Sequence, residues 1–298
     1  MKVLRESQMQ LSQPTSLRLL DVRLAEGLHK AAVAGKFKNV AAVLTTVEEA
    51  TLPGLLEYLC LRHTRGQDLQ LPPLPDRIVK SPLGRSLQQV VCPFGLRTSG
   101  AFSPSSSVNP FGSEFFALRN SADYLAQEYK LFETRWARAC ERLGFRERSS
   151  ALLLALTAMV ENAILHANSP AGVLVGYQQT QNAAAFTVAD VGIGVLASLR
   201  SNCDFIHLRH HRDALRLALQ DGVSCLGVGN GFGFHQLFKA LANQYGTIRL
   251  RTGDVCVTMD GQDFDADIGQ ETFPEAIQGM VVTVCCRKDS SAPGESRI

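Results

Sequence analysis

Hydrophobic residues recur at helical spacing along much of this 298-residue chain. Apolar positions three or four residues apart, with polar residues between them, predict amphipathic helices. A glycine follows two of these stretches closely and supplies a stop signal, and Ser121 can cap the start of another. The predicted helices cover 24–35, 52–62 (with Pro53 in the first turn), 121–143, a segment from Ser149 or Ser150 to Asn168, and 234–243.

Shorter runs of β-branched and apolar residues predict strands. The segments 172–178 and 184–191 are separated by a polar turn and have the composition of a hairpin. The segment 38–47 (KNVAAVLTTV) is interpreted as a buried strand, and 115–119 as an edge strand. Further strands are predicted at 17–22, 67–71, 247–252, 255–259 and 280–286.

The composition changes between Leu71 and Gly112, where seven prolines and a run of three serines occur. Proline fixes φ and removes a backbone donor, so this region predicts loops and an interdomain linker. The resulting fold class is α+β. The predicted organisation is a loose N-terminus (1–15), a small α/β domain (16–95), a linker (96–112), a larger domain (113–287) and a disordered tail (288–298).

Composition narrows the class of protein. A net charge of +2, without a basic run, argues against nucleic acid or an anionic membrane surface as a partner. The longest nearly continuous apolar run, 151–160, is half of the roughly 20 residues that a membrane-spanning helix needs. The N-terminus lacks the apolar core of a signal peptide, so a cytoplasmic protein is expected. The eight cysteines form no C-x-x-C pair, which favours buried apolar cysteines over a metal or redox site.

The predicted helix at 149–168 carries the first candidate binding residues. Asn162 and His166 are four residues apart and lie on one face, which they share with Ala155 and Ala158. Small side chains leave room for a ligand, an Asn carbonyl suits Mg²⁺, and His166 could reach a phosphate oxygen. The alternative is that Asn162 satisfies a backbone group and His166 lies at a helix edge.

A second candidate is the turn in VADVGIGV. Asp190 ends a predicted strand, and its carboxylate can accept a hydrogen bond from an exocyclic amine such as that of adenine. Gly192 and Gly194 allow the backbone to approach a flat ring. The alternative is an ordinary glycine-rich turn at a strand end.

A third candidate is the run of alternating glycines at Gly227, Gly229, Gly231 and Gly233, ahead of an amphipathic helix. Closely spaced glycines expose backbone N–H groups, and the helix N-terminus adds partial positive charge, so the run predicts an anion site. It fits neither the P-loop pattern nor G-x-G-x-x-G.

In this order the three motifs resemble those of the GHKL superfamily of ATPases and kinases, which includes gyrase and the sensor histidine kinases. ENAILHA resembles its N box, DVGIG its adenine box and GNGFGF its lid box, and the similarity covers roughly 113–287. The resemblance implies a Bergerat fold, with a mixed sheet covered by helices on one face. It also implies that ATP and Mg²⁺ bind, with Asn162 as the metal ligand and Thr283 near the adenine.

Within that superfamily, residues 115–145 are most similar to the anti-sigma-factor serine kinases, and MVENAILHA also resembles the LytS-type histidine kinases. The segment 38–62 faintly resembles the STAS domains that partner anti-sigma kinases. The resemblance implies cytoplasmic signalling, a regulatory protein partner and a homodimer, because such kinases often pair.

One departure from the family concerns catalysis. The family's general base is a Glu four residues before the N-box Asn, and here that position is Ala158. Glu161 points about 100° away around the helix and is a weak substitute. Two hypotheses therefore remain: an ATP-dependent kinase that phosphorylates a partner serine, and a non-catalytic adaptor in which the nucleotide controls protein binding.

The segment 195–226 lies where the family has its ATP lid. It contains His207, His210 and His211, but without the carboxylates and spacing of a metal site it is interpreted as a solvated lid helix. Arg209 or Arg212 could touch phosphate when the lid closes.

Overall fold

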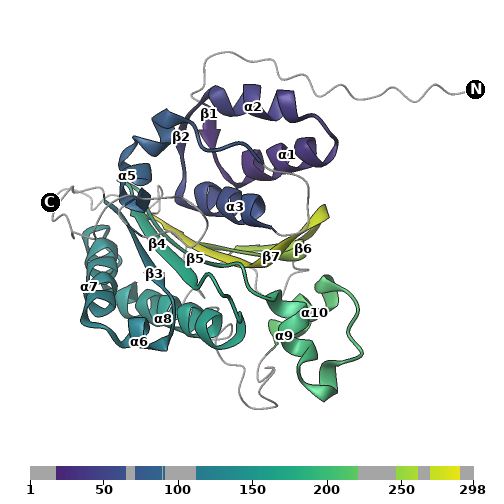
Figure 1. Cartoon of the computed structure of the whole chain (residues 1–298). Helices are drawn as coiled ribbons and strands as arrows, with labels where there is room; N and C mark the ends of the chain where they lie inside the picture. Colours follow the sequence, from purple (N-terminus) through teal and green to yellow (C-terminus); the bar gives the residue numbers. More distant parts are fainter. Residues whose placement is uncertain are drawn as a thin grey trace, which may run out of the picture.

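The computed structural model describes residues 18–64, 71–88, 90, 112–220, 246–260 and 269–288. The α+β class is confirmed, because helices pack on a sheet whose neighbouring strands are all antiparallel (Figure 1). The five strands lie in the order β3-β4-β5-β7-β6. They are β3 (Ser113–Leu118), β4 (Val173–Gln179), β5 (Ala183–Asp190), β6 (Gly246–Asp260) and β7 (Gly269–Arg287).

The local strand predictions for this sheet hold. β4 and β5 form the expected hairpin, with Val173 opposite Asp190, and β3 is an edge strand. This sheet is antiparallel rather than mixed, because each neighbouring pair of its five described strands is antiparallel. The predicted strands 247–252 and 255–259 are one strand with an irregularity at Gly253, whose φ is 53°. β7 begins 11 residues before the predicted strand at 280–286.

One face of the sheet is covered by α6 (Ser121–Leu125), α7 (Gln127–Arg142) and α8 (Ser149–His166) (Figure 1). The predicted single helix 121–143 is divided at Ala126, whose ψ of 147° is extended. The cap also differs from the prediction, because Asn120 rather than Ser121 accepts the free N–H groups of the first turn. Gly144 follows α7 at φ 85°, as a glycine stop should.

The other face is covered by the N-terminal segment, while α6, α7 and α8 of the larger predicted domain lie on one face, as expected (Figure 1). This segment contains β1 (Arg18–Leu20), α1 (Val22–Val33), α2 (Phe37–Thr45), β2 (Val47–Ala50) and α3 (Leu52–His63). β1 and β2 form a separate parallel pair. Leucines of α3 share one hydrophobic core with Leu174, Ala189 and Val281 of the sheet. Residues 18–90 and the sheet therefore bury a common surface.

The predicted strand 38–47 is helical. Val40 and Leu44 are its buried residues, and their spacing of four places both on one face of α2. The short strand that pairs with β1 comes afterwards, at β2, where Glu48 and Glu49 are exposed. An apolar run of this length fits a helix and a strand equally well, and contact with α1 and the core decides between them.

The proline-rich region is more ordered than predicted. It contains α4 (Asp76–Val79) and α5 (Pro82–Gln88), with Pro75 preceding the first and Pro82 beginning the second. Proline is compatible with a helix start, because the first N–H groups have no intrahelical partner. The predicted strand 67–71 lies outside the described residues except for Leu71, and so do the linker 96–112 except for Gly112, the N-terminus 1–15 and nearly all of the tail.

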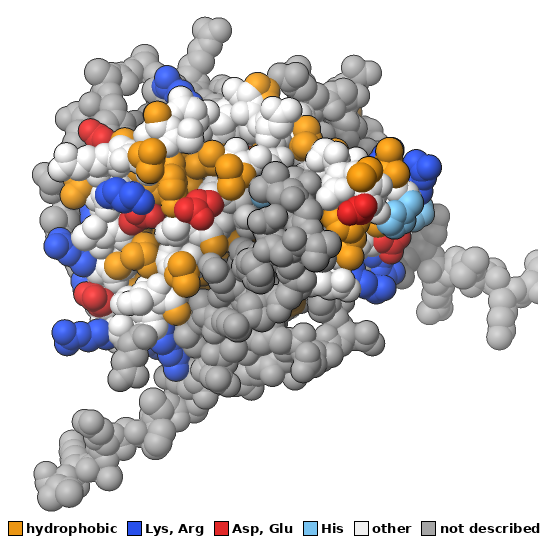
Figure 2. Space-filling model, turned by 90° about the horizontal axis from the view of Figure 1, so that it is seen from below, with side chains coloured by type: hydrophobic (Ala, Val, Ile, Leu, Met, Phe, Trp, Pro, Cys, Tyr) orange, Lys and Arg blue, Asp and Glu red, His pale blue; other side chains and the backbone are white. Residues whose placement is uncertain are grey.

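α8 is the one helix in the described residues that is long and apolar enough to cross a membrane by length and composition. It packs under the sheet as a core helix, with Leu152, Leu156 and Met159 buried. Its outer side is apolar as well, since Leu154 and Leu165 are 51% and 68% exposed. Figure 2 shows hydrophobic side chains gathered on the α6–α8 side of the molecule, with acidic and basic side chains among them. One such helix is not enough to make a membrane protein.

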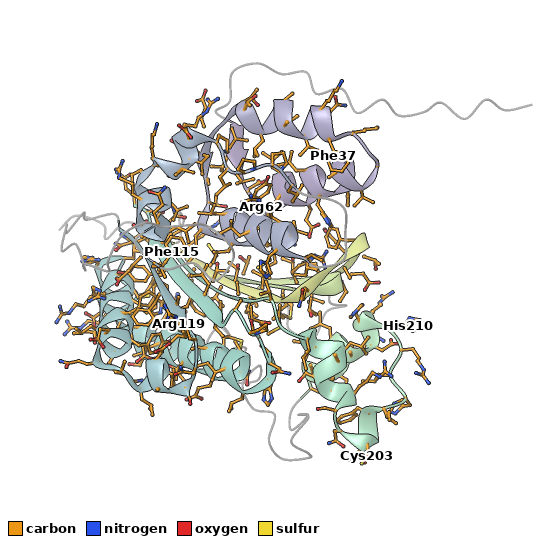
Figure 3. All side chains as sticks on the ribbon, in the orientation of Figure 1. Phe37, Arg62, Phe115, Arg119, Cys203 and His210 are labelled. Atoms are coloured by element: carbon orange, nitrogen blue, oxygen red, sulfur yellow. The ribbon has the colours of Figure 1, made fainter. Side chains whose placement is uncertain are left out.

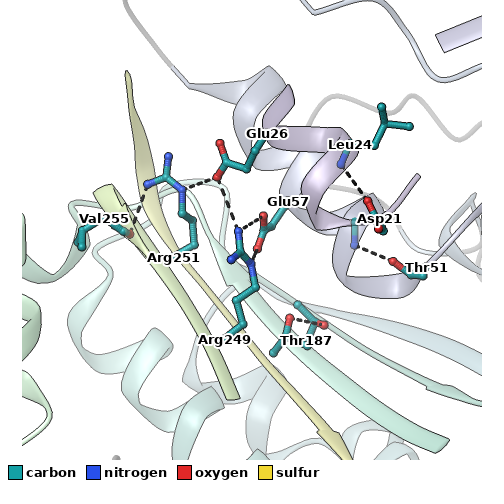
Figure 4. Close-up of polar contacts among 11 residues, drawn as sticks. Asp21, Leu24, Glu26, Thr51, Glu57, Thr187, Arg249, Arg251 and Val255 are labelled. Carbon is teal, nitrogen blue, oxygen red and sulfur yellow. Dashed lines mark hydrogen bonds and ion pairs between the residues drawn. The ribbon is translucent and has the colours of Figure 1, made fainter. Parts of the chain in front are cut away.

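Two arginines of β6 join the sheet to the N-terminal helices (Figure 4). Arg249 binds both carboxylate oxygens of Glu57 on α3, at 2.6 and 3.1 Å. Arg251 donates to Glu26 of α1 at 2.6 Å and stacks on the ring of Phe273, 4.3 Å from its centroid. All four charged side chains are at most 14% exposed. The pattern along the sequence gives no sign of this ionic cluster, because Arg249 lies 192 residues from Glu57 and Arg251 lies 225 residues from Glu26.

Candidate functional site

The turn after β5 is packed against the end of α8. The Ile193 N–H donates to the carbonyl oxygen of Ala167, the residue that follows α8, at 2.7 Å. A Cβ at Gly192 would lie 1.8 Å from the same oxygen, so only glycine fits there. The structure thus brings the turn after β5 into direct contact with the end of α8, a contact that the order of the two segments in the sequence does not specify.

Asp190 ends β5, as predicted, and lies 3% exposed at the centre of this junction. Its neighbours at two-residue spacing, Val188 and Phe186, belong to the core under α8, so the side chain of Asp190 faces α8. Its Oδ1 accepts the Gly192 N–H at 2.8 Å, and the Met280 N–H also donates to it. Burial raises the pKa of Asp190 to about 7, and the two backbone donors only partly offset that effect.

Gly194 and Gly279 complete the close packing around Asp190. Both have positive φ, 72° and 79°, a conformation that favours glycine. A Cβ on Gly279 would lie 2.2 Å from the carbonyl oxygen of Asp190, and one on Gly194 would lie 3.2 Å from the oxygen of Gly279. Sequence reasoning identified Gly194 but missed Gly279, whose only signal in the sequence is its position just before the predicted strand 280–286.

Asn162 and His166 lie on the sheet side of α8. They continue the stripe of Ala155 and Met159, both fully buried beneath the sheet, and are themselves partly buried. Burial lowers the pKa of His166, so its neutral form is favoured. Asn162 and His166 therefore lie on the same side of the sheet as the Asp190 side chain, at the end of α8 that meets the turn.

The two residues considered as general base are placed differently. Ala158 is 6% exposed and belongs to the hydrophobic core. Glu161 is exposed on another side of α8, where its Oε1 accepts the hydroxyl of Tyr124 at 2.6 Å. The predicted direction of Glu161, away from Asn162, agrees with this contact. Neither residue offers a free base beside Asn162.

Thr283 lies on the opposite face of the sheet from Asp190. It is opposite Thr187 in the register, and the two hydroxyls are 3.0 Å apart. Its strand neighbours Val282 and Val284 face α8, while Val281 faces α3, so Thr283 faces α3 as well. The residue opposite Asp190 on the α8 side is Met280. The structure does not bring Thr283 together with Asn162 and Asp190.

The segment after the turn contains α9 (Gly194–Arg200), a short 3₁₀ helix and α10 (His211–Ala218). His211 contacts Asp254 of β6, with Nδ1 2.9 Å from Oδ1. Figure 3 shows His210 and Cys203 on the outside of this segment. No cluster of three metal-ligating side chains occurs among the described residues. The predicted glycines Gly227, Gly229, Gly231 and Gly233 lie outside the described residues.

Four of the described cysteines fit the interpretation of apolar core residues. Cys60, Cys140, Cys256 and Cys286 are buried, whereas Cys203 is exposed. Burial raises the pKa of Cys256 to about 12, so its thiol stays protonated at neutral pH.

The chain was compared with protein-family models and with curated protein sequences, and neither comparison gives a match. The case for a function therefore depends on the residues and their geometry.

Proposed function

We propose that this protein binds adenine nucleotide between α8 and the turn after β5, and that it acts as a regulatory protein of the GHKL class. The observation that carries the proposal is Asp190, a buried carboxylate whose described partners are two backbone N–H groups. A carboxylate has about four acceptor positions, so Asp190 keeps capacity for a further donor. The amine of adenine is such a donor.

The residues around Asp190 fit a flat base. Gly192 and Gly194 allow α8 and β7 to pack closely against the turn, and these contacts fix the turn beside the carboxylate. Met280, opposite Asp190 on the same face, adds an adaptable apolar side chain that can contact a ring. The glycine run 227–233, the proposed phosphate cradle, lies outside the described residues, so the support concerns the base end of the nucleotide.

Asn162 is the proposed ligand of Mg²⁺. Its amide oxygen is a hard donor on the sheet side of α8, one turn before His166. A magnesium ion bound with ATP would neutralise phosphate charge. Neutral His166, partly buried on the same face, can donate one ring N–H to a phosphate oxygen.

Two roles are proposed for the bound nucleotide. In the first, the protein transfers phosphate to a serine of a regulatory partner, as the anti-sigma kinases do. In the second, it is a non-catalytic adaptor whose partner binding depends on the nucleotide. The positions of Ala158 and Glu161 favour the adaptor, because the first has no basic group and the second is hydrogen-bonded to Tyr124.

Isothermal titration calorimetry of the full chain with ATP, with and without Mg²⁺, tests the proposed binding. Asp190→Asn should abolish binding, and Asn162→Ala should remove its dependence on Mg²⁺. Thr283→Val is the matched control, because it removes a buried hydroxyl from the other face of the sheet and should leave the affinity unchanged. If the wild-type protein does not bind ATP in this titration, the proposal is refuted.

A second experiment separates the two roles. The full chain is incubated with γ-labelled ATP and candidate partner proteins, and the partner serines are examined for label. Transfer that disappears in Asn162→Ala would exclude the adaptor, while tight binding without transfer or hydrolysis would exclude the kinase. Glu161→Gln should leave either result unchanged, since Glu161 faces Tyr124.

The proposed setting is cytoplasmic signalling, with residues 16–95 as the unit that recognises the partner. The common core of α3 and the sheet supports this arrangement. α3 packs against β5, the strand that ends at Asp190, so a partner bound to the N-terminal helices would contact a unit that touches this strand. A homodimer is part of the proposal, and light scattering of the purified chain tests it.

A further inference from the structure

Thr252 of β6 is completely buried beside the turn that follows Asp190. Its hydroxyl donates to the carbonyl oxygen of Gly279 on β7 at 2.9 Å and accepts the N–H of Val195 on α9 at 3.3 Å. One side chain therefore bridges two segments that sequence reasoning did not connect. No feature of the isolated β6 sequence distinguishes Thr252 from the other threonines of that strand.

We propose that Thr252 is a positioning residue of the nucleotide site, which holds the turn 192–195 against the strand that lies beside Asp190. This inference rests on the proposed function, and it names a residue that contributes to the affinity of the proposed site for ATP. Thr252 acts through the backbone of the turn, since it is 0% exposed and its hydroxyl both donates and accepts within the fold.

The packing explains why this hydroxyl matters. Gly279 touches Asp190 on one side, where a Cβ would meet the aspartate carbonyl oxygen at 2.2 Å. On its other side its carbonyl oxygen receives the Thr252 hydroxyl. Gly279 therefore contacts Asp190 directly, and Thr252 links Gly279 to the turn. Through these contacts Thr252 fixes the turn relative to Asp190.

Thr252 also completes the start of α9. That helix begins at Gly194 without a side-chain cap from Ile193, and its first N–H groups need acceptors. Thr252 supplies one from another strand. Without it, the partly buried N–H group of Val195 loses its acceptor and the turn occupies more conformations, so ordering the turn becomes a cost of binding.

The test compares ATP affinity in four full-length proteins. Thr252→Val keeps the shape of the side chain but removes the hydroxyl, and it should weaken binding roughly tenfold, the equivalent of one to two lost hydrogen bonds. Thr252→Ser keeps the hydroxyl and should restore affinity to within about twofold of the wild type. Thr187→Val removes a buried strand hydroxyl on the other face and should leave affinity unchanged.

The outcomes separate this inference from the proposed function. If the wild type does not bind ATP, the proposed function fails. If the wild type binds and Thr252→Val binds equally well, Thr252 has no positioning role and the proposed function stands. If valine prevents folding, Thr252→Ala replaces it, and equal affinity of the alanine and serine variants overturns the inference. Equal weakening by Thr252→Val and Thr187→Val would show general destabilisation, which also overturns it.

Discussion

Arg249 of β6 and Glu57 of α3 form a two-point ion pair, with Nε and Nη2 at 2.6 and 3.1 Å from the two carboxylate oxygens. Burial alone would lower the pKa of Arg249, but the hydrogen bonds and charge of Glu57 more than offset this, and the pKa is raised. Arg249 therefore keeps its charge inside the protein, while burial raises the pKa of Glu57 and the hydrogen bonds from Arg249 oppose that effect. It fixes the N-terminal helices on the sheet face opposite α8.

Removing one partner of this pair should strongly destabilise the fold. Arg249→Met removes the ion-pair partner of Glu57, which is less than 10% exposed, and leaves Arg251 as the partner of Glu26 among the described residues. A loss of about 3–5 kcal/mol is expected in urea unfolding, because a buried carboxylate loses its partner. The double variant Arg249→Met with Glu57→Leu should recover most of that loss.

An exposed pair provides the control. Lys80 and Asp76 lie 3.1 Å apart with both side chains more than 70% exposed, and Lys80→Ala should change stability by less than about 1 kcal/mol. Equal effects of the single and double variants at Arg249 and Glu57 would contradict the coupling of the buried pair.

Alanine substitutions at two glycines, Gly192 and Gly27, should change the stability of the fold in opposite directions. Gly192→Ala places a Cβ 1.8 Å from the Ala167 carbonyl oxygen, so it should destabilise the protein by about 1–3 kcal/mol and separate the turn from α8. Gly27→Ala lies in the exposed side of α1 with nothing within 4 Å, and should stabilise by about 0.5–1 kcal/mol. Both are measured by urea unfolding, and a stabilising Gly192→Ala would refute the close packing.

Asp190 predicts a pH dependence of stability. Its pKa is about 7 in the folded protein against 3.8 for an unperturbed aspartate, so between these values the folded state binds more protons than the unfolded state. Stability from this group is present at low pH and is lost as the pH rises toward 7. Unfolding free energies of wild type and Asp190→Asn at pH 5, 6, 7 and 8 should therefore diverge in favour of the variant as the pH rises. A constant difference would contradict the raised pKa.

His166 must be separated from this effect, because its sign is opposite. Its folded pKa is lowered from 6.5, so the stability that it contributes is present above 6.5 and is lost on acidification. The comparison of Asp190→Asn with wild type cancels the histidine contribution, since His166 is present in both proteins.

Local features of this fold could be predicted from the sequence, and long-range ones could not. The hairpin β4–β5 and the strand end at Asp190 follow from alternation and turn composition within about 20 residues. The face on which Thr283 lies depends on its register with Thr187, 96 residues away. A shift of one residue in that register moves the hydroxyl across the sheet, and sequence pattern alone does not specify it.

The same limit explains the missed residues of the candidate site. Asn162, His166, Asp190, Gly192 and Gly194 belong to short motifs, so their residue types and spacing identify them. Thr252 and Gly279 act through contacts between strands that are distant in sequence, and neither belongs to a motif. The charge cluster of Arg249 and Arg251 was missed for the same reason, because their partners lie on α1 and α3.

The protonation of Asp190 should also control nucleotide affinity. The adenine amine needs an acceptor, which the carboxylate supplies and the protonated acid supplies less well. Affinity for ATP should therefore rise with pH until about 7 and then level off, with a change approaching tenfold for each pH unit well below that value. Ionisation of the ATP phosphates contributes equally to every protein compared, so the ratio of wild-type affinity to that of a variant removes it.

Glu161→Gln should keep the wild-type profile, because that side chain faces Tyr124. Thr252→Ser should keep it as well. A flat ratio between wild type and any Asp190→Asn protein that retains measurable binding would show that this carboxylate does not face the base.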